Sequence, residues 1–135
     1  MRQHDPDVAA FLAVGSFAVV GASADRGKYG NKVLRCYQQH GLPVVGVHPK
    51  LTSCEGAPVH PSLAAVPGAP RAVSIVAPPA AAAAIVQDAL AAGCKQLWFQ
   101  PGAEEPAAIA TARAAGLSVI ADGPCVLVAL GFRDV

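Results

Sequence analysis

The chain has 135 residues, of which 53% are hydrophobic and only 5% aromatic, and its 10 basic and 9 acidic residues give a formal net charge of +1. This length fits one domain. The few aromatic residues and the absence of a long basic run argue against a nucleic-acid-binding surface. No apolar run reaches the roughly 18 residues of a membrane span, and the N-terminus lacks an apolar signal-peptide core. We therefore predict one cytoplasmic domain, residues 1–135, with no nucleic-acid or membrane partner and with four reduced cysteines.

The chain opens with a predicted leading helix within residues 1–16, in which Asp5 is the expected cap and Pro6 the first helical residue. The apolar run 17–22 follows, and such a run is typical of a strand that is buried on both faces of a parallel sheet. Apolar residues then recur at helical spacing, which predicts a helix over 28–40.

The rest of the chain continues this alternation. Further strands are predicted at 43–47, 72–77, 95–100 and 117–121, and further helices at 78–92 and 104–115. The stretch 51–70, rich in Pro and Gly, is expected to be irregular, and residues 126–135 to form a short apolar closing segment. Strands that alternate with helices form right-handed βαβ units and a parallel sheet. The prediction is therefore an α/β, Rossmann-like three-layer domain, with a five-stranded parallel sheet of order 3-2-1-4-5 and helices on both faces. Its topological switch point, where ligands bind beyond the carboxyl ends of the strands, would lie between strands 1 and 4.

The loop after the first strand, residues 21–31, has the composition of a phosphate-binding loop. Gly21 closes the strand and lets a ligand approach, the amide groups of the following helix start attract anions, and Arg26 and Lys28 add positive charge. The dinucleotide pattern G-x-G-x-x-G is absent because Ser23 stands where its second Gly would be, and the P-loop pattern is absent too. By itself the loop fits either phosphate binding or a tight turn with incidental glycines.

A set of short motifs follows the predicted strands in order. They are Gly-Ala-Ser at 21–23, Lys-Tyr-Gly-Asn at 28–31, Val-His-Pro-Lys at 47–50, Pro-Pro at 78–79, Trp-Phe-Gln-Pro-Gly at 98–102, and Asp122 with Cys125. No one motif is specific, but the ordered set covers nearly the whole chain. In this set the chain resembles the stand-alone CoA-binding domain family, which is related to the CoA-binding domain of the succinyl-CoA synthetase alpha subunit.

The resemblance implies that coenzyme A or a short acyl-CoA binds at the carboxyl ends of the strands, with each loop holding a different part of it. The implied pyrophosphate residues are Gly21, Ala22, Ser23, Lys28, Tyr29, Gly30 and Asn31, and the positive charge of Arg26 in the same loop adds it to the candidate site. Those beside the adenosine 3′-phosphate are His48, Pro49 and Lys50; those along the adenine or pantetheine side are Ala77, Pro78 and Pro79; and those toward the pantetheine end are Gln100, Gly102 and Cys125.

The chain departs from the family pattern at three places. His48 replaces the usual Asn, Ala77 replaces a frequent polar or basic residue before the two prolines, and Asp-Gly-Pro-Cys at 122–125 is one residue longer than Asp-x-Cys. His48 therefore has two open roles, ligand contact or capping of its own strand. Cys125 also has two, a mixed disulfide with the CoA thiol or a small buried residue. No set of His and Cys has the spacing of a metal site, so no metal is predicted.

Three functional classes remain open from the sequence. A non-catalytic CoA-binding module is favoured, because no nucleophile–base–orienter set is recognisable and the chain is too short to contain the second domain of the related synthetase. An NADP-binding Rossmann protein is the second, since His-Pro-Lys at 48–50 replaces the acidic residue that NAD requires. The third is a regulatory or interaction subunit whose segment 126–132 docks to a partner enzyme or to a second copy, as a homodimer.

Overall fold

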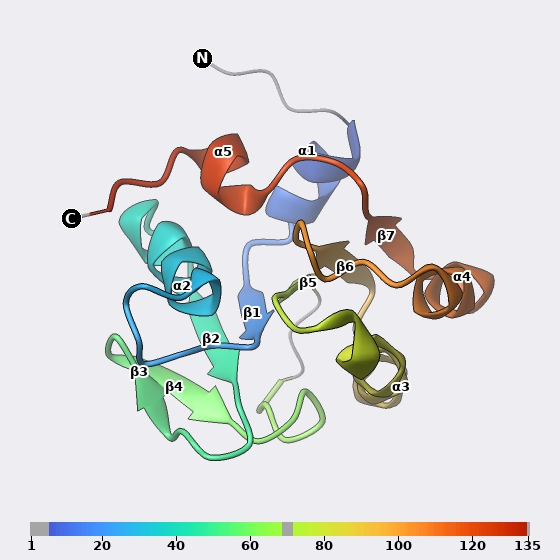
Figure 1. Cartoon of the computed structure of the whole chain (residues 1–135), viewed down its shortest axis with the longest axis horizontal. Coiled ribbons are helices and arrows are strands. Elements are labelled where there is room, and N and C mark those ends of the chain that lie inside the picture. The colour runs from blue at the N-terminus through green and yellow to red at the C-terminus, as the bar shows by residue number, and fades with distance from the viewer. Residues whose placement is uncertain (1–5, 69–71, 135) are drawn as a thin grey trace.

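The computed structural model describes residues 6–68 and 72–134, so the predicted cap Asp5 lies outside the described residues. Within these residues seven strands form one sheet of order β3-β4-β2-β1-β5-β6-β7 (Figure 1). The strands are β1 Phe17–Val20, β2 Val44–Val47, β3 Ser53–Cys54, β4 Ala57–His60, β5 Ala72–Ile75, β6 Gln96–Phe99 and β7 Ser118–Ile120. All neighbouring strands are parallel except β3 and β4, which are antiparallel.

The predicted five-stranded sheet of order 3-2-1-4-5 is wrong. Two strands were missed, and one of them, β4, explains the error in the order. The stretch 51–70, expected to be irregular, contains β3 and β4. Strand β4 pairs with β2, where Val59 lies opposite Gly46, and so takes the place beside β2 that was predicted for the third strand. The segment predicted as the third strand, β5, lies instead beside β1, with Ala72 opposite Phe17. The switch point is therefore between β1 and β5, and not between β1 and the strand at 95–100.

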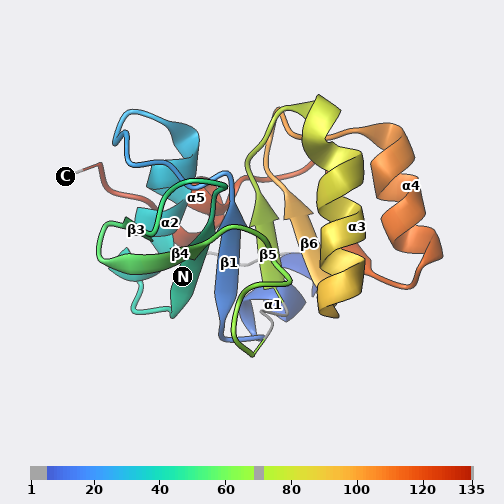
Figure 2. The ribbon, with the colours of Figure 1, turned by 90° about the horizontal axis from the view of Figure 1, so that it is seen from below.

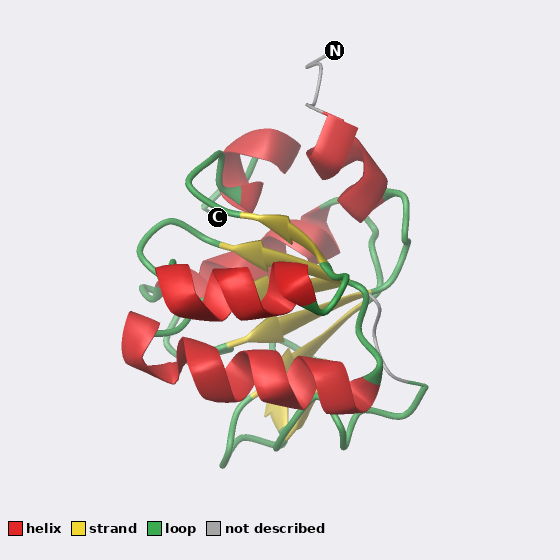
Figure 3. Cartoon of the chain, turned by 90° about the vertical axis from the view of Figure 1, so that its right-hand side faces the viewer, coloured by secondary structure: helices red, strands yellow, loops and turns green. Residues whose placement is uncertain are grey.

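Helices cover both faces of the sheet, as predicted (Figures 1 and 3). They are α1 Pro6–Leu12, α2 Tyr29–Gln39, α3 Ala82–Ala92, α4 Pro106–Ala114 and α5 Val126–Leu130, with a short 3-10 turn, Pro79–Ala81, before α3. The first, second and fifth helices pack on one face, and α3 and α4 lie side by side on the other (Figure 2). None of the described helices is long and apolar enough to cross a membrane.

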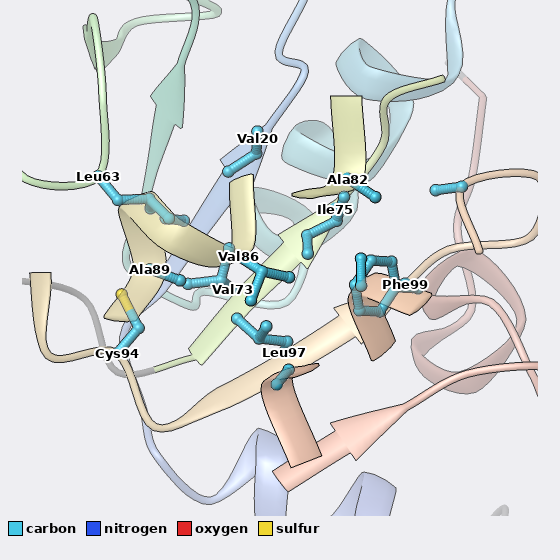
Figure 4. Packing of buried hydrophobic residues seen from close by; sticks show 14 of the residues in the cluster. Val20, Leu63, Val73, Ile75, Ala82, Val86, Ala89, Cys94, Leu97 and Phe99 are labelled. Carbon is cyan, nitrogen blue, oxygen red and sulfur yellow. The ribbon is translucent and has the colours of Figure 1, made fainter. Parts of the chain in front are cut away.

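Alternation along the strands divides the core between the two faces. In β1, Ala18 and Val20 contribute to the cluster under α3 and α4, while Phe17 and Val19 contribute to the cluster under α1, α2 and α5. This is the period of two that a strand imposes on its side chains. Figure 4 shows the first cluster, in which small residues of α3 such as Ala89 let the helix approach the sheet closely.

Trp98 and two of the cysteines lie in the interior of the protein. Trp98 is fully buried, and its indole Nε1 donates a hydrogen bond of 2.9 Å to the carbonyl oxygen of Pro124. Cys36 and Cys94 are both buried, at 0% and 1% exposure. These thiols act as small apolar residues in the two layers of the core.

Candidate functional site

The loop after β1 is packed tightly against neighbouring main chain. Gly21 has φ +97°, and a Cβ at this residue would lie 1.7 Å from the carbonyl oxygen of Val76, just after β5. A Cβ at Gly30, in the first turn of α2, would lie 1.9 Å from the carbonyl oxygen of Gly21. The two glycines thus permit a close approach of β1, β5 and α2. The space that the sequence assigned to a ligand at Gly21 is occupied by the protein's own backbone, although Gly21 still borders the groove described below.

A buried polar network lies beneath this loop. Asn31 is fully buried, and its Nδ2 donates to the carbonyl oxygen of Ser23 at 2.8 Å and to Glu55 Oε2 at 3.1 Å. Arg35, only 4% exposed, donates from Nε to Asn31 Oδ1 at 2.6 Å and from Nη2 to the carbonyl oxygen of Arg26 at 3.0 Å. The side chain of Asn31, a predicted ligand residue, is therefore committed to contacts within the protein. Arg35 was missed by the sequence analysis.

The predicted cationic residues lie on the surface around the loop. Arg26, whose side chain is 57% exposed, places Nε 3.7 Å from a carboxylate oxygen of Glu55. Lys28 is the N-cap residue of α2 and makes no side-chain capping bond. Lys50, after β2, is also exposed. These three residues lie on the loops that follow the two adjacent strands β1 and β2.

The turn after β2 is closed by His48. Its Nδ1 accepts hydrogen bonds from the backbone N–H of Lys50 at 3.0 Å and of Leu51 at 3.1 Å. Of the two open roles for His48, the capping role is the one that the hydrogen bonds show. The same bonds fix the turn on which Lys50 lies.

A groove of about 330 Å³ lies at the carboxyl ends of β1 and β2, beside α3. Of the predicted site residues it brings together Gly21, His48, Pro49 and Ala77. Further lining residues, which the sequence analysis missed, are Val20, Val47, Pro61, Ala81, Ala84, Ile85 and Asp88. Asp88 is held in place because its carboxylate accepts from the N–H groups of Leu63 and Ala64, at 2.7 and 3.2 Å.

A second hollow continues this edge of the sheet at the ends of β5 and β6. It shares Ala77 with the groove and also includes the predicted residues Pro78 and Gly102. Pro79, in the 3-10 turn, is not among the residues lining either hollow. The two hollows together follow the carboxyl edge on both sides of the switch point, where open α/β sheets bind their ligands.

The residues around the start of α5 form the other end of this region. Gln100 is fully buried; its Oε1 accepts from the N–H of Val126 at 2.9 Å, while its Nε2 has no partner among the described residues. Cys125, half-buried, is the N-cap residue of α5. Burial raises the pKa of the Tyr29 phenol, and a hydrogen bond with Cys125 raises this pKa further.

Comparison with known proteins identifies relatives of the whole domain. Residues 15–131 match the family model described as CoA binding domain. A conserved hypothetical protein from Pyrococcus furiosus is 33% identical, with a TM-score of 0.79 over 84% of this chain and 97% of that chain. A hypothetical protein from Pyrococcus horikoshii OT3 is 25% identical, with a TM-score of 0.82 over 96% of this chain and 99% of that chain.

A larger protein also contains a similar domain. The dinucleotide-forming acetyl-coenzyme A synthetase 1 of Ca. Korarchaeum cryptofilum is 26% identical with a TM-score of 0.69, and the likeness covers 78% of this chain but only 25% of that chain. A comparison with curated proteins gave no match.

Proposed function

The chain belongs to the CoA binding domain family, and from this membership we propose that it binds coenzyme A, or a short acyl-CoA, along the carboxyl edge of the sheet. The observation that carries the proposal is the family match over residues 15–131. The groove supports it, because Gly21, His48 and Ala77, which follow three different strands, all line it.

The distribution of charge fits this ligand. CoA carries about four negative charges, from a pyrophosphate and a 3′-phosphate. Arg26 and Lys28 lie on the loop that leads into α2, where the helix N-terminus adds a favourable field for the pyrophosphate. We assign Lys50 to the 3′-phosphate and the groove beside Ala84 and His48 to the adenosine.

The pantetheine arm would extend toward Gln100. A buried donor without a partner costs free energy, and Gln100 Nε2 is such a donor. Pantetheine contains two amide carbonyl groups that can accept a hydrogen bond, and the fully buried Gln100 side chain would have to turn toward the hollow to donate to either. We propose that the protein acts as a binding module rather than as a ligase.

Cys125 gives this module one reaction. Its thiolate would attack a disulfide of CoA, forming a protein–CoA disulfide and releasing one CoA thiolate, so that the CoA disulfide is the oxidant and no other reactant is needed. Mass spectrometry after incubation with CoA disulfide should show one added CoA on the protein and none on Cys125→Ser. An adduct that persists in the variant would place the reaction at another cysteine.

The binding test uses calorimetry with CoA, acetyl-CoA, dephospho-CoA, NADP and ATP. Ala84→Trp fills the groove and should weaken CoA binding at least tenfold. Ala114→Trp is the matched control, because Ala114 is exposed on α4 and is not among the groove residues, so this substitution should leave the affinity unchanged. Binding of NADP without binding of CoA would instead favour the NADP-binding alternative.

The assignment of Lys50 has its own test. Lys50→Ala should weaken CoA by about fivefold and leave dephospho-CoA unchanged, because only CoA carries the 3′-phosphate. Lys95→Ala, an exposed lysine before β6 and hence at the opposite edge of the sheet, is the control. An equal loss for both ligands would contradict the assignment.

A further inference from the structure

The C-terminal tail, residues 131–134, lies along α2 after the chain leaves α5 (Figure 1). Two residues at the end of α2 hold its first part. His40 Nε2 lies 3.0 Å from the carbonyl oxygen of Gly131. Gln39 binds the backbone of Arg133 twice, since its Oε1 accepts from the N–H at 3.0 Å and its Nε2 donates to the carbonyl oxygen at 2.5 Å. Hydrogen bonds from these two side chains to the main chain of the tail therefore fix its path.

The end of the tail meets Arg35. Asp134 Oδ1 lies 3.4 Å from both Nη1 and Nη2 of Arg35, and its Oδ2 lies 3.6 Å from Lys32 Nζ. The ring of Phe132 lies under the guanidinium group, with 5.2 Å from the ring centroid to Cζ. Arg35 is almost fully buried, and a buried charge needs both a counter-charge and satisfied donors. The tail supplies a carboxylate and an aromatic face for this guanidinium group.

Arg35 connects the tail to the proposed phosphate loop. It donates directly to the carbonyl oxygen of Arg26, and it donates to Asn31, which in turn holds the carbonyl oxygen of Ser23. Both ends of the segment 23–26 are therefore anchored to one guanidinium–amide pair. A displacement of that pair changes the conformation of the loop at both anchor points.

We propose that the tail 131–134 supports the ligand site indirectly, and that Arg35 and Asp134 are positioning residues that hold the loop 23–26 in its binding conformation. The affinity part of this proposal rests on the proposed CoA binding. The family match ends at residue 131, so Phe132 and Asp134 lie beyond what the family model describes. If the tail is released, the loop samples other conformations. The apparent affinity for the ligand then falls in proportion to the fraction of molecules whose loop remains in the binding conformation.

If Asp134 acted only through its charge, removing that charge would change ligand affinity in the opposite direction. Asp134 is an exposed carboxylate, 61% of its side chain being accessible, and it lies on the network that holds the loop. Removing a negative charge near an anionic ligand should raise affinity if charge is the main effect. The direction of the change in affinity therefore separates positioning from simple repulsion.

The experiment compares Asp134→Asn and Gln39→Ala with wild type. Gln39→Ala releases the tail without changing any charge. Both variants should weaken CoA by about fivefold, whereas Asp134→Glu should restore affinity because it keeps the carboxylate. Asp7→Asn on α1 and Gln87→Ala on α3 are matched controls on exposed residues outside the network, and they should bind as wild type does.

Hydrogen exchange of the ligand-free protein provides the second readout. The amides of residues 23–27 should exchange faster in both tail variants, while those of β1 and β5 should not change. Unchanged loop exchange, or an unchanged or raised CoA affinity in the variants, would overturn the proposal. If wild type fails to bind CoA, the proposed function fails, and the exchange comparison still decides whether the tail positions the loop.

Discussion

Gly21 and Gly30 lie in a main-chain contact that leaves no space for a side chain at either residue. We expect Gly30→Ala to destabilise the protein by about 2–3 kcal/mol, because the added Cβ would lie 1.9 Å from the Gly21 carbonyl oxygen and backbone must move. Gly27→Ala in the same loop meets only the side chain of Asp25, at 3.3 Å, and should cost less than about 0.5 kcal/mol. Urea unfolding measures both, and equal losses would contradict this account.

The turn after β2 depends on the side chain of His48. Its Nδ1 accepts from two backbone N–H groups, of Lys50 and Leu51, in the way that an Asn side-chain oxygen does in an Asx turn. We therefore predict that Asn, the residue expected at this position from the resemblance, would be an equivalent acceptor.

Two substitutions at His48 test this equivalence. His48→Asn should keep both stability and CoA affinity. His48→Leu leaves two N–H groups without their acceptor and should cost about 1 kcal/mol of unfolding free energy, with weaker binding of CoA because Lys50 is no longer fixed. Thermal unfolding and calorimetry give the two readouts, and a similar loss in both variants would refute the equivalence.

At the scale of elements, apolar runs predicted β1, β2, β5, β6 and β7, but not β4. This strand, Ala57–His60, is no shorter than the strands that were predicted, but it includes Pro58, which lacks the N–H that a strand normally offers. Its strand partners are two other segments of the chain, β2 on one side and β3 on the other. Pairing between segments is not visible in local composition, and missing this one strand also displaced β5 in the predicted order.

The candidate site was also predicted only in part from the sequence. Loops at the carboxyl ends of strands could be named because parallel strands bring these ends to one edge. Arg35 could not be identified, since its partners are the loop nine residues before it and Asp134, 99 residues after it. A charged residue on a helix gives no signal of burial when its partners are so far along the chain.

Helix α4 depends on an unusual cap. The Glu105 carboxylate accepts from the N–H groups of Ala107 and Ala108, and Pro106 occupies the first helical position. We expect Glu105→Ala to lower the unfolding free energy by about 1 kcal/mol and Glu105→Ser to restore most of it, because Ser is a favourable N-cap residue. Chemical unfolding checks the order of the variants, and equal stability of the Ala and Ser variants would show that the capping bonds contribute little.

For the whole molecule, the buried thiols predict a loss of stability in alkaline solution. Burial raises the pKa of Cys36 from 9.0 to about 12 and that of Cys94 from 9.0 to about 11. Between these values and 9.0 the unfolded chain loses thiol protons that the folded chain keeps, so the unfolded state binds fewer protons and stability falls as pH rises. Below pH 9 this contribution is fully present.

The corresponding experiment follows the urea midpoint from about pH 8 to about pH 11. Wild type should lose stability over this range, and the double variant Cys36→Ala, Cys94→Ala should lose less. Part of the loss should remain, because burial also raises the pKa of Tyr37. Parallel curves for the two proteins would mean that the thiols are not responsible.

The path of the tail has a practical consequence for handling the protein. A purification tag attached after Val135 begins one residue from Asp134, whose carboxylate lies 3.4 Å from Arg35. If the tail positions the loop as we propose, such a tag would compete with the contacts of residues 131–134 and lower the measured affinity. An N-terminal tag would begin before α1, which contacts β7, and is the arrangement that we expect to disturb the loop least.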